Sequence, residues 1–284
     1  MSFDYDKLKR KGFLKQRQEG QFLIRFRSIA GNLSSEELRA MADIADQYGK
    51  GYVHLTTRLG VEIPWITTEN CELVSGKIEQ YALNTGASGK RIRTVVACPG
   101  SQVCRYGIVD TTEIAARLDR EFFGKDVPTK TKIAVSGCPN SCAKPQENDI
   151  GLSGVITPVL SEESCSGCGL CEESCPNHAI KIENGLPRIE EDKCLHCGRC
   201  IEACPTGAWQ EGRRGFKLYV GGKVGRKPKL GQVLINYLEE EEVVGTIQKV
   251  LAAFADLAQK GERIADVVER VGLQEFKKHV VNLV

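Results

Sequence analysis

The chain has 284 residues, of which 41% are hydrophobic and 27% are charged, enough apolar content for about two compact domains and too much for a disordered chain or a fibre. Its 39 basic and 37 acidic residues give a formal net charge of +2, so no overall field favours nucleic acid or an anionic membrane. The first 20 residues alternate charges and lack the apolar core of a signal peptide, and no run of about 18 apolar residues could span a bilayer. We therefore expect a cytoplasmic protein that neither inserts into a membrane nor binds nucleic acid.

Residues 1–87 are expected to form an N-terminal α+β domain, a sheet covered by two helices. Hydrophobic and polar residues alternate in 21–28, as they do in a half-buried strand. Ser34 and Glu37 have the spacing of a capping box ahead of an apolar stripe with helical periodicity. The expected elements are strands at 21–28, 52–57 and 59–66 and helices at 34–48 and 70–83.

The remainder is expected to form one domain, residues 88–159 and 212–284, interrupted by residues 160–211. The inserted segment is dense in cysteine and poor in other large apolar residues, so bound metal must replace the missing core. In the surrounding domain, the pattern predicts a helix at 111–122, strands at 130–136 and 216–220, a glycine-rich basic loop at 221–228, and helices at about 232–260 and 262–280.

The cysteines carry the strongest signal, because 12 of the 13 fall into tight clusters and only Cys71 stands alone. In a chain without a secretion signal, such clusters favour metal over disulfides. Residues 160–211 contain the spacing C-x2-C-x2-C-x3-C-P twice; three thiolates then wrap one face of a cubane and the fourth reaches the other cluster. We predict a two-cluster ferredoxin of the bacterial type, with one [4Fe-4S] cluster on Cys165, Cys168, Cys171 and Cys204 and a second on Cys194, Cys197, Cys200 and Cys175.

Two further cysteine pairs lie upstream, with the spacings Cys98-x5-Cys104 and Cys138-x3-Cys142. Four thiols supply a full coordination set, so these pairs indicate a third metal site, with a zinc site or buried structural thiols as alternatives. In the repeat of residues 160–211, zinc knuckles are disfavoured, because tetrahedral zinc uses two cysteine pairs separated by a dozen or more residues.

At these residues the sequence closely resembles the siroheme-dependent sulfite and nitrite reductase family, whose paired motif is C-x5-C followed by C-x3-C with a Gly-Cys-Pro-Asn core, here residues 137–140. The resemblance implies an α+β half-repeat of that family, a ferredoxin-like sheet followed by a siroheme and [4Fe-4S] domain. It also implies a third [4Fe-4S] cluster on Cys98, Cys104, Cys138 and Cys142, with Cys142 as the axial ligand of the siroheme iron. The inserted ferredoxin is similar to that of dissimilatory and anaerobic sulfite reductase subunits.

Basic residues stand where the family binds sulfite and siroheme carboxylates. The matching positions are Arg58, Arg93, Lys130 and Lys132. The resemblance implies that all four bind the substrate anion and stabilise charge as S–O bonds break, and that Arg58 and Arg93 also contact siroheme. For Lys223 and Arg226 in the glycine-rich loop, a role in binding siroheme carboxylates and a purely solvated loop are both open.

The activity implied is the six-electron reduction of sulfite to sulfide, with electrons supplied through the built-in ferredoxin clusters by a ferredoxin or by an NADH-linked partner subunit. The chain holds one family repeat, whereas assimilatory enzymes fuse two and dissimilatory enzymes pair two subunits. We therefore expect a homo-oligomer or an anaerobic heteromeric complex. Nitrite reduction at the same site and a non-catalytic iron-sulfur electron-transfer subunit remain alternatives.

Overall fold

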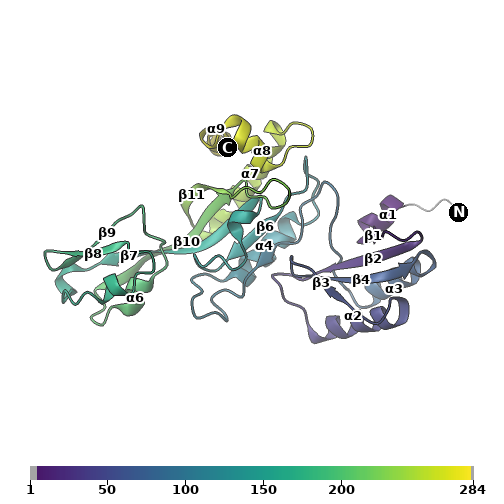
Figure 1. The fold of residues 1–284 in the computed structure, drawn as a ribbon, viewed down its shortest axis with the longest axis horizontal. Coiled ribbons are helices and arrows are strands. Elements are labelled where there is room, and N and C mark those ends of the chain that lie inside the picture. The colour runs from purple at the N-terminus through teal and green to yellow at the C-terminus, as the bar shows by residue number, and fades with distance from the viewer. Residues whose placement is uncertain (1–4, 283–284) are drawn as a thin grey trace.

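The structure, a computed structural model, describes residues 5–282, so the first four and last two residues of the expected outer domains lie outside it. Three parts follow one another along the long axis (Figure 1): the N-terminal domain, a central domain, and a small lobe at the opposite end. The C-terminal helices stand on one side of the central domain. The mixed α+β class expected from the sequence is confirmed.

The N-terminal domain is a four-stranded antiparallel sheet covered by helices. The strand order is β1-β2-β4-β3, with β1 (Phe13–Lys15), β2 (Gln21–Arg27), β3 (His54–Leu55) and β4 (Gly60–Thr67). The helices are α1 (Tyr5–Arg10), α2 (Ser35–Tyr48) and α3 (Cys71–Gln80), the last preceded by the 3-10 turn η1 (Thr68–Asn70). The predicted capping box opens α2: the Ser34 hydroxyl accepts from the Glu37 N–H at 3.0 Å, and the Glu37 carboxylate accepts from the Ser34 N–H at 2.7 Å.

The strand expected at 52–57 is reduced to the two residues of β3. It ends early because of the turn that follows it. The Thr56 hydroxyl accepts hydrogen bonds from the N–H groups of Arg58 and Gly60, at 3.3 and 3.0 Å. Leu59 adopts a left-handed backbone with φ 57° to complete the turn. Side chain and backbone of Thr56 thus end the strand early and fix the direction in which Arg58 leaves the sheet.

The central domain is built on a five-stranded mixed sheet of order β11-β10-β7-β6-β5. Its strands are β5 (Val96–Ala97), β6 (Ile133–Ser136), β7 (Ile150–Leu160), β10 (Trp209–Val220) and β11 (Gln232–Leu238). The first three are parallel, and β10 pairs antiparallel with both β7 and β11. Helix α4 (Thr111–Phe122) connects β5 to β6, begins at the residue that the sequence indicated and is capped by Asp110, whose carboxylate accepts from the Thr112 and Glu113 N–H groups.

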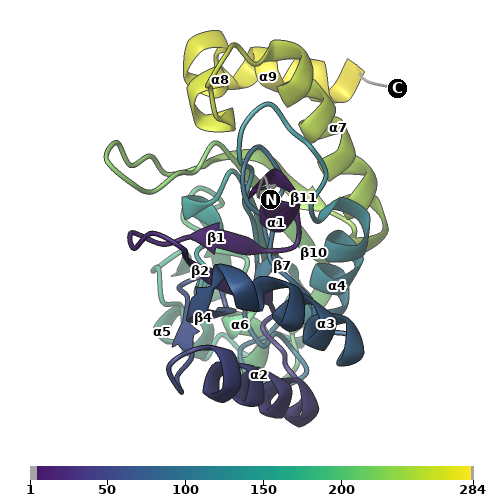
Figure 2. The same ribbon diagram turned by 90° about the vertical axis from the view of Figure 1, so that its right-hand side faces the viewer.

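The C-terminal prediction was partly wrong. Residues 232–238 form the edge strand β11 instead of the start of a helix, because Val233, Ile235 and Tyr237 are side chains that suit a pleated surface and β10 offers them a pairing edge. The acidic run forms the 3-10 turn η4 (Glu240–Glu242) and leads into α7 (Val243–Leu257). The last predicted helix is divided into α8 (Ile264–Val271) and α9 (Leu273–Asn282) by Gly272, with φ 85°. In Figure 2, α7 and α4 lie side by side, and both contribute to the main core.

The lobe is inserted between two neighbouring strands of the central sheet. Strands β7 and β10 continue beyond the sheet as an antiparallel pair that ends at Leu160 opposite Trp209, and residues 161–208 lie between these ends. The lobe contains the turn η3 (Glu162–Ser164), the short helices α5 (Leu170–Glu173) and α6 (Arg199–Ala203), and the hairpin β8 (Ile180–Glu183) and β9 (Leu186–Ile189). Its buried core consists of Cys171, Ile180, Cys200 and Trp209. Half of this core is therefore thiol.

The N-terminal domain is joined to the central domain by a cation from β2. Arg27 forms an ion pair with Asp119 of α4 at 3.1 Å, and its guanidinium lies 3.8 Å from the centre of the Phe123 ring. Asp119 is 4% exposed, and burial raises the pKa of its carboxyl while Arg27 opposes the rise. A partly buried pair of this kind fixes the orientation of one domain on the other.

A second buried ion pair, between Asp149 and Arg263, lies within the central domain. Asp149, directly before β7 and fully buried, accepts two hydrogen bonds from Arg263, at 3.0 and 2.6 Å, and one from the backbone N–H of Lys132 at 2.9 Å. Its carbonyl accepts from Gly221 at 2.9 Å. Asp149 thereby connects the start of β6, the glycine-rich loop and the C-terminal helices.

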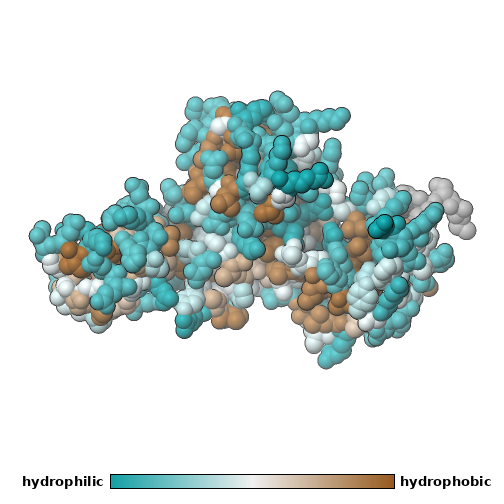
Figure 3. Space-filling view, viewed as in Figure 1, coloured by the Kyte–Doolittle hydropathy of each residue, from teal (hydrophilic) through white to brown (hydrophobic). Residues whose placement is uncertain are grey.

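The surface is mostly hydrophilic on the face shown in Figure 3, with hydrophobic side chains gathered over the lower part of the N-terminal domain near β3 and α2. In and around β3 the exposed large hydrophobic residues are Tyr52, Val53, Leu55 and Leu59, and in α2 Leu38 is exposed as well. Within residues 5–282, none of the helices combines the length and the apolar character needed to cross a bilayer.

We predict that Arg263→Met lowers the free energy of unfolding by about 3–5 kcal/mol, because it leaves the carboxylate of Asp149 buried without its partner. Lys278→Met, which breaks a surface pair with Glu275 whose side chains are 70% and 47% exposed, should cost no more than about 1 kcal/mol. Chemical denaturation of both variants measures the difference. Equal losses would mean that the buried pair does not stabilise the central domain.

Candidate functional site

Two of the predicted cysteine pairs lie at the carboxyl ends of adjacent parallel strands. Cys98 directly follows β5, and Cys138 comes two residues after β6. The register pairs Ala97 with Val135, the Cys98 N–H donates to the Val135 carbonyl at 3.2 Å, and the Gly137 N–H donates to the Cys98 thiol at 3.1 Å. The edge of a sheet where parallel strands end is a common place for ligands.

The other two cysteines of this group converge on the same place. Burial raises the pKa of Cys138, and the nearby thiols of Cys98, Cys104 and Cys142 act in the same direction. Glycines permit the close approach: a Cβ on Gly137 would lie 2.9 Å from the Cα of Gly100. We call Cys98, Cys104, Cys138 and Cys142 the central set; Cys142 is its exposed member.

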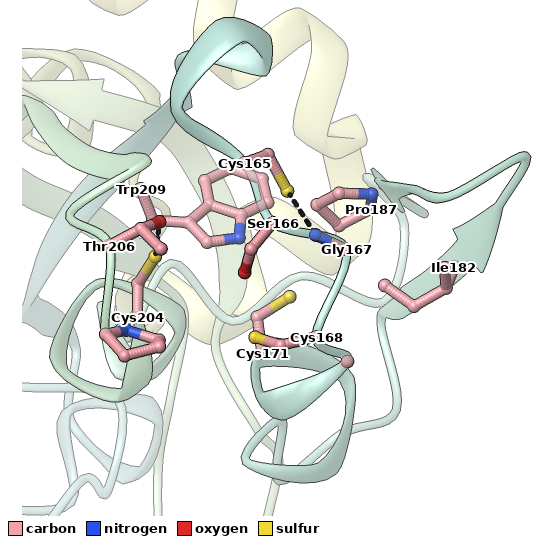
Figure 4. Close-up of a pocket in the computed structure, with 12 residues that line it drawn as sticks. Cys165, Ser166, Gly167, Cys168, Cys171, Ile182, Pro187, Cys204, Thr206 and Trp209 are labelled. Carbon is pink, nitrogen blue, oxygen red and sulfur yellow. Dashed lines mark hydrogen bonds between the residues drawn. The ribbon is translucent and has the colours of Figure 1, made fainter.

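Four thiols of the lobe line one pocket (Figure 4). They are Cys165, Cys168 and Cys171 from the first cysteine motif and Cys204 from the second. Ile182, Pro187 and Trp209 form apolar parts of the wall, and the buried indole N–H of Trp209 lies beside the Cys171 thiol. The Gly167 N–H donates to the Cys165 thiol at 3.5 Å. We call these four cysteines the first lobe set.

The remaining four thiols line a separate pocket. Cys194, Cys197 and Cys200 come from the second motif and Cys175 from the first, and the four are named the second lobe set. Backbone N–H groups again point at sulfur, from His196 to Cys194 at 3.4 Å and from Ala179 to Cys175 at 3.2 Å. The two motifs thus exchange their last cysteines, the arrangement predicted from the repeat.

The donor chemistry of each lobe pocket fits an iron-sulfur cluster. Thiols supply the ligands, backbone N–H groups supply hydrogen bonds to sulfur, and the remaining walls are largely apolar. Among residues 5–282, no three His, Cys, Asp or Glu side chains are grouped so as to hold a single metal ion. The cluster assignments remain predictions.

The four predicted basic residues line a single cavity of about 490 Å³ between the N-terminal and central domains. Arg58 enters from the turn after β3, Arg93 from the segment before β5, and Lys130 and Lys132 from the segment before β6. The segments of Arg93 and Lys132 run together, because the Arg93 N–H donates to the Thr131 carbonyl at 2.9 Å. Residues far apart in sequence therefore present their charges to one space.

Both arginines are held by neutral acceptors, and within residues 5–282 neither forms an ion pair with a carboxylate. Arg58 donates to Asn148 Oδ1 and to the Thr94 carbonyl, each at 2.7 Å. Arg93 donates to the carbonyls of Ala87 and Gly89, at 2.5 and 3.0 Å. In each residue, Nε is buried and finds no acceptor in the described part of the chain. Burial, together with the charges of Arg93 and Arg263 and against the opposing charge of Asp149, lowers the pKa of Arg58 to about 10.

Lys132 is the most perturbed amine of the cavity. Burial, followed by the charges of Arg58 and Arg263, lowers its pKa to about 8, and Asp149 opposes the shift. Its ammonium forms no ion pair with any described residue, and Lys130 beside it is exposed. Clustered, poorly compensated cations are favourable only where an anion compensates them, so the cavity is suited to an oxyanion or to carboxylates.

Sequence reasoning missed several contributors to this cavity. Arg25 and His54 also line it, and Arg25 is partly neutralised by Glu62 at 2.6 Å. The alternation in 21–28 placed Arg25 on the polar face of its strand, which was the available signal. No sequence pattern pointed to Asn148 or Asp149, because their partners Arg58 and Arg263 lie about 90 and 114 positions away in the chain.

The two basic residues predicted in the glycine-rich loop lie elsewhere. Lys223 forms an ion pair with Asp266 of α8, and its side chain is 13% exposed. Arg226 is exposed. Neither lines the cavity of Arg58 and Lys132.

Comparisons with known proteins identify relatives of the whole chain. The family described as nitrite and sulphite reductase 4Fe-4S domain matches residues 88–283, and the nitrite/sulfite reductase ferredoxin-like half domain matches residues 14–81. The coenzyme F420-dependent sulfite reductase of Methanocaldococcus jannaschii is 39% identical over 96% of this chain and 44% of its own length. One subunit of the anaerobic sulfite reductase of Salmonella typhimurium is 31% identical over 99% of this chain and 90% of its own length.

The fold has a close counterpart among solved structures. The crystal structure of dissimilatory sulfite reductase I superposes with a TM-score of 0.75 at 21% identity, covering 93% of this chain and 70% of that one. The chain spans less than half the length of the F420-dependent relative. The likeness to a sulfite/nitrite reductase half-repeat expected from the sequence is confirmed.

We predict that an amine-acylating reagent labels Lys132 with a midpoint near pH 8 in protein prepared without siroheme, because the folded cavity favours the neutral amine. Added sulfate should raise the midpoint, since an anion in the cavity favours the ammonium. Peptide mapping by mass spectrometry across a pH series measures both effects. A midpoint near the ordinary lysine value of about 10.4, unmoved by sulfate, would contradict the assignment of an anion site.

Proposed function

This chain belongs to the nitrite and sulfite reductase family, and on that basis we propose that it reduces sulfite to sulfide with siroheme and three [4Fe-4S] clusters. The observation that carries the proposal is the convergence of Arg58, Arg93, Lys130 and Lys132 on one cavity. Siroheme, when bound, supplies the iron at which the sulfur of the substrate is reduced. The relatives of known activity in the comparisons include sulfite reductases at 31% and 39% identity.

The basic residues would bind the substrate anion and stabilise negative charge on its oxygens. Arg58 and Arg93 are oriented by carbonyl and amide acceptors, so their charge is fixed in place before an anion arrives. Lys132, with a pKa of about 8, is close to the range in which an amine can both donate and regain a proton near neutral pH. We assign it the transfer of protons to the departing oxygens.

The residues around the cavity fit a carboxylate-rich tetrapyrrole. A second cavity of about 530 Å³ adjoins the first at the Thr56–Gly60 turn, where Leu59 lines one and Arg58 the other, and its walls include Ala30, Ala97, Pro99 and Val103. The same cavity is also lined by Asp110, which caps α4, and by Glu113, so it is apolar on one part of its wall and acidic on another. The apolar part beside the cations of the first cavity suits the ring of a macrocycle with acidic side chains. Cys142 would ligate its iron, and Arg58, Arg93 and the solvent-exposed Arg226 would bind its carboxylates; Lys223 could do so only by leaving Asp266.

The lobe would serve as the built-in ferredoxin. We propose residues 160–211 as an inserted two-cluster domain, with residues 88–159 and 212–284 as the siroheme and cluster domain and residues 1–87 as the N-terminal half domain. Two pockets with four thiols each support this division. An outside donor, such as a ferredoxin or an NADH-linked subunit, would reduce the lobe, and a cytoplasmic location follows from that supply. The exposure of Cys142 supports assembly with a second copy or a partner subunit that covers the siroheme site.

We predict that anaerobically purified protein, expressed with siroheme available, contains an acid-extractable siroheme and about thirteen irons per chain, about twelve of them in clusters and one in siroheme. Cys204→Ala and Cys197→Ala should each remove about four irons, because each disrupts one lobe set. Absorption spectra, pigment extraction and iron quantitation measure these contents. Iron without any siroheme would reject the reductase and favour an electron carrier.

We predict that Lys132→Met lowers the turnover of sulfite by about 100-fold or more, because it removes a charge that stabilises the departing oxygens. Iron and siroheme contents should stay unchanged. Lys249→Met, at an exposed position of α7, is the matched control and should retain full activity. Turnover with reduced viologen as donor measures both, for sulfite and for nitrite. Undiminished turnover in Lys132→Met would remove this residue from the catalytic site.

A further inference from the structure

The two thiol sets of the lobe lie at different distances from the central domain. The pocket of the second lobe set includes Pro158 of β7, and the His196 carbonyl, between two of its cysteines, accepts from the Ile156 N–H at 2.9 Å. A Cβ on Gly198 would lie 2.8 Å from the Ile156 side chain. Ile201, which follows Cys200, packs against both the lobe core and the main core. The second lobe set therefore faces the central sheet.

The first lobe set faces the other way. Its pocket is walled by Ile182 and Pro187 of the hairpin, and a Cβ on Gly167, between two of its cysteines, would lie 2.9 Å from the Gly185 carbonyl at the tip of that hairpin. Figure 1 shows β8 and β9 at the far end of the lobe, whereas α6 lies nearer the central domain. Strand β7 ends at Leu160, and Cys165, the first cysteine of the first lobe set, lies beyond that end of the strand.

One aromatic side chain spans the gap between the second lobe set and the central set. The guanidinium of Arg199, which directly precedes Cys200, lies 4.6 Å from the ring centre of Tyr106, which comes two residues after Cys104. Arg105 lies 4.4 Å from the same ring centre and donates a hydrogen bond to the Tyr106 hydroxyl. Tyr106 also packs against the main core, which fixes the ring. Cation–π contacts on a fixed ring hold both loops in one orientation.

We propose that Tyr106 and Arg199 are positioning residues that hold the second lobe set beside Cys104. A cluster on the second lobe set, rather than one on the first, would then be the neighbour of a cluster on the central set. With clusters bound, each transfer between neighbouring sets would oxidise the donor cluster by one electron and reduce the acceptor cluster by one, with no bond formed or broken. An external low-potential one-electron donor would reduce the cluster on the first lobe set, which lies at the outer end of the lobe. The inference rests on the three-cluster part of the proposed function.

The order of the sets can be tested by the magnetic interaction between reduced clusters. We expect the central cluster of the reduced, siroheme-loaded protein to show spin-relaxation enhancement from its neighbour in electron paramagnetic resonance. Cys168→Ala, which removes the first lobe set, should leave the enhancement, and Cys197→Ala, which removes the second, should abolish it. Iron content verifies each loss. Survival of the enhancement in Cys197→Ala, its loss in Cys168→Ala, or its absence from the unmodified protein would overturn the order.

The positioning role is tested by a matched pair of substitutions. Tyr106→Leu removes the ring and should reduce the enhancement several-fold, whereas Tyr106→Phe keeps the stack and should retain it. Equal values in the two variants and the unmodified protein would overturn the role of Tyr106. Siroheme content and sulfite turnover, measured on the same samples, separate the outcomes: a loaded, active enzyme without the enhancement keeps the proposed function and rejects this inference. Clusters with the enhancement but without siroheme would do the reverse.

Discussion

The buried carboxylate of Asp149 is the interaction on which the geometry of the anion cavity depends. It accepts two hydrogen bonds from Arg263 and one from the Lys132 N–H, so it ties the start of β6 to the C-terminal helices. It is also the negative charge that opposes the lowering of the pKa of both Arg58 and Lys132. Without it, Arg58, Lys132 and Arg263 would lie close together with little compensating negative charge. The C-terminal helices therefore support the site although they do not line it.

The lobe must be stabilised in a different way, because it has almost no apolar core. Two of its four buried core residues are cysteines, and the hairpin of β8 and β9 is too small to stabilise itself. The antiparallel pair of β7 and β10 holds the lobe on the central sheet. Metal coordination would stabilise the rest of the lobe if thiolates from both cysteine motifs bind the same cluster. The same thiols would then serve both folding and electron transfer. Their spacing is therefore tightly constrained, which is why the cysteine pattern was easy to recognise in the sequence.

The parts of the molecule that the sequence predicted are those set by local spacing. The capping box of Ser34, the bounds of α4 and the exchange of Cys175 and Cys204 between motifs all follow from residues within a few turns of one another or from an exact repeat. Residues 232–238 were misjudged because an apolar run fits either element, and the exposed edge of β10 decided the matter. The contacts of Arg58 with Asn148 and of Asp149 with Arg263 were beyond reach, since no local pattern reports a partner about 90 or 114 residues away.

The antiparallel pair of β7 and β10, which connects the lobe to the central sheet, also bears on how such a chain can evolve. The lobe leaves the sheet at Leu160 and returns at Trp209, and these residues are direct cross-strand partners, so the two ends of the inserted segment are about 5 Å apart. A tight two-residue turn could close the same gap and leave an ordinary hairpin. Gaining or losing the lobe therefore requires no rearrangement of the sheet, and the closure entropy of a longer loop grows only slowly with its length. A domain of this shape can therefore acquire or lose the lobe as a single unit.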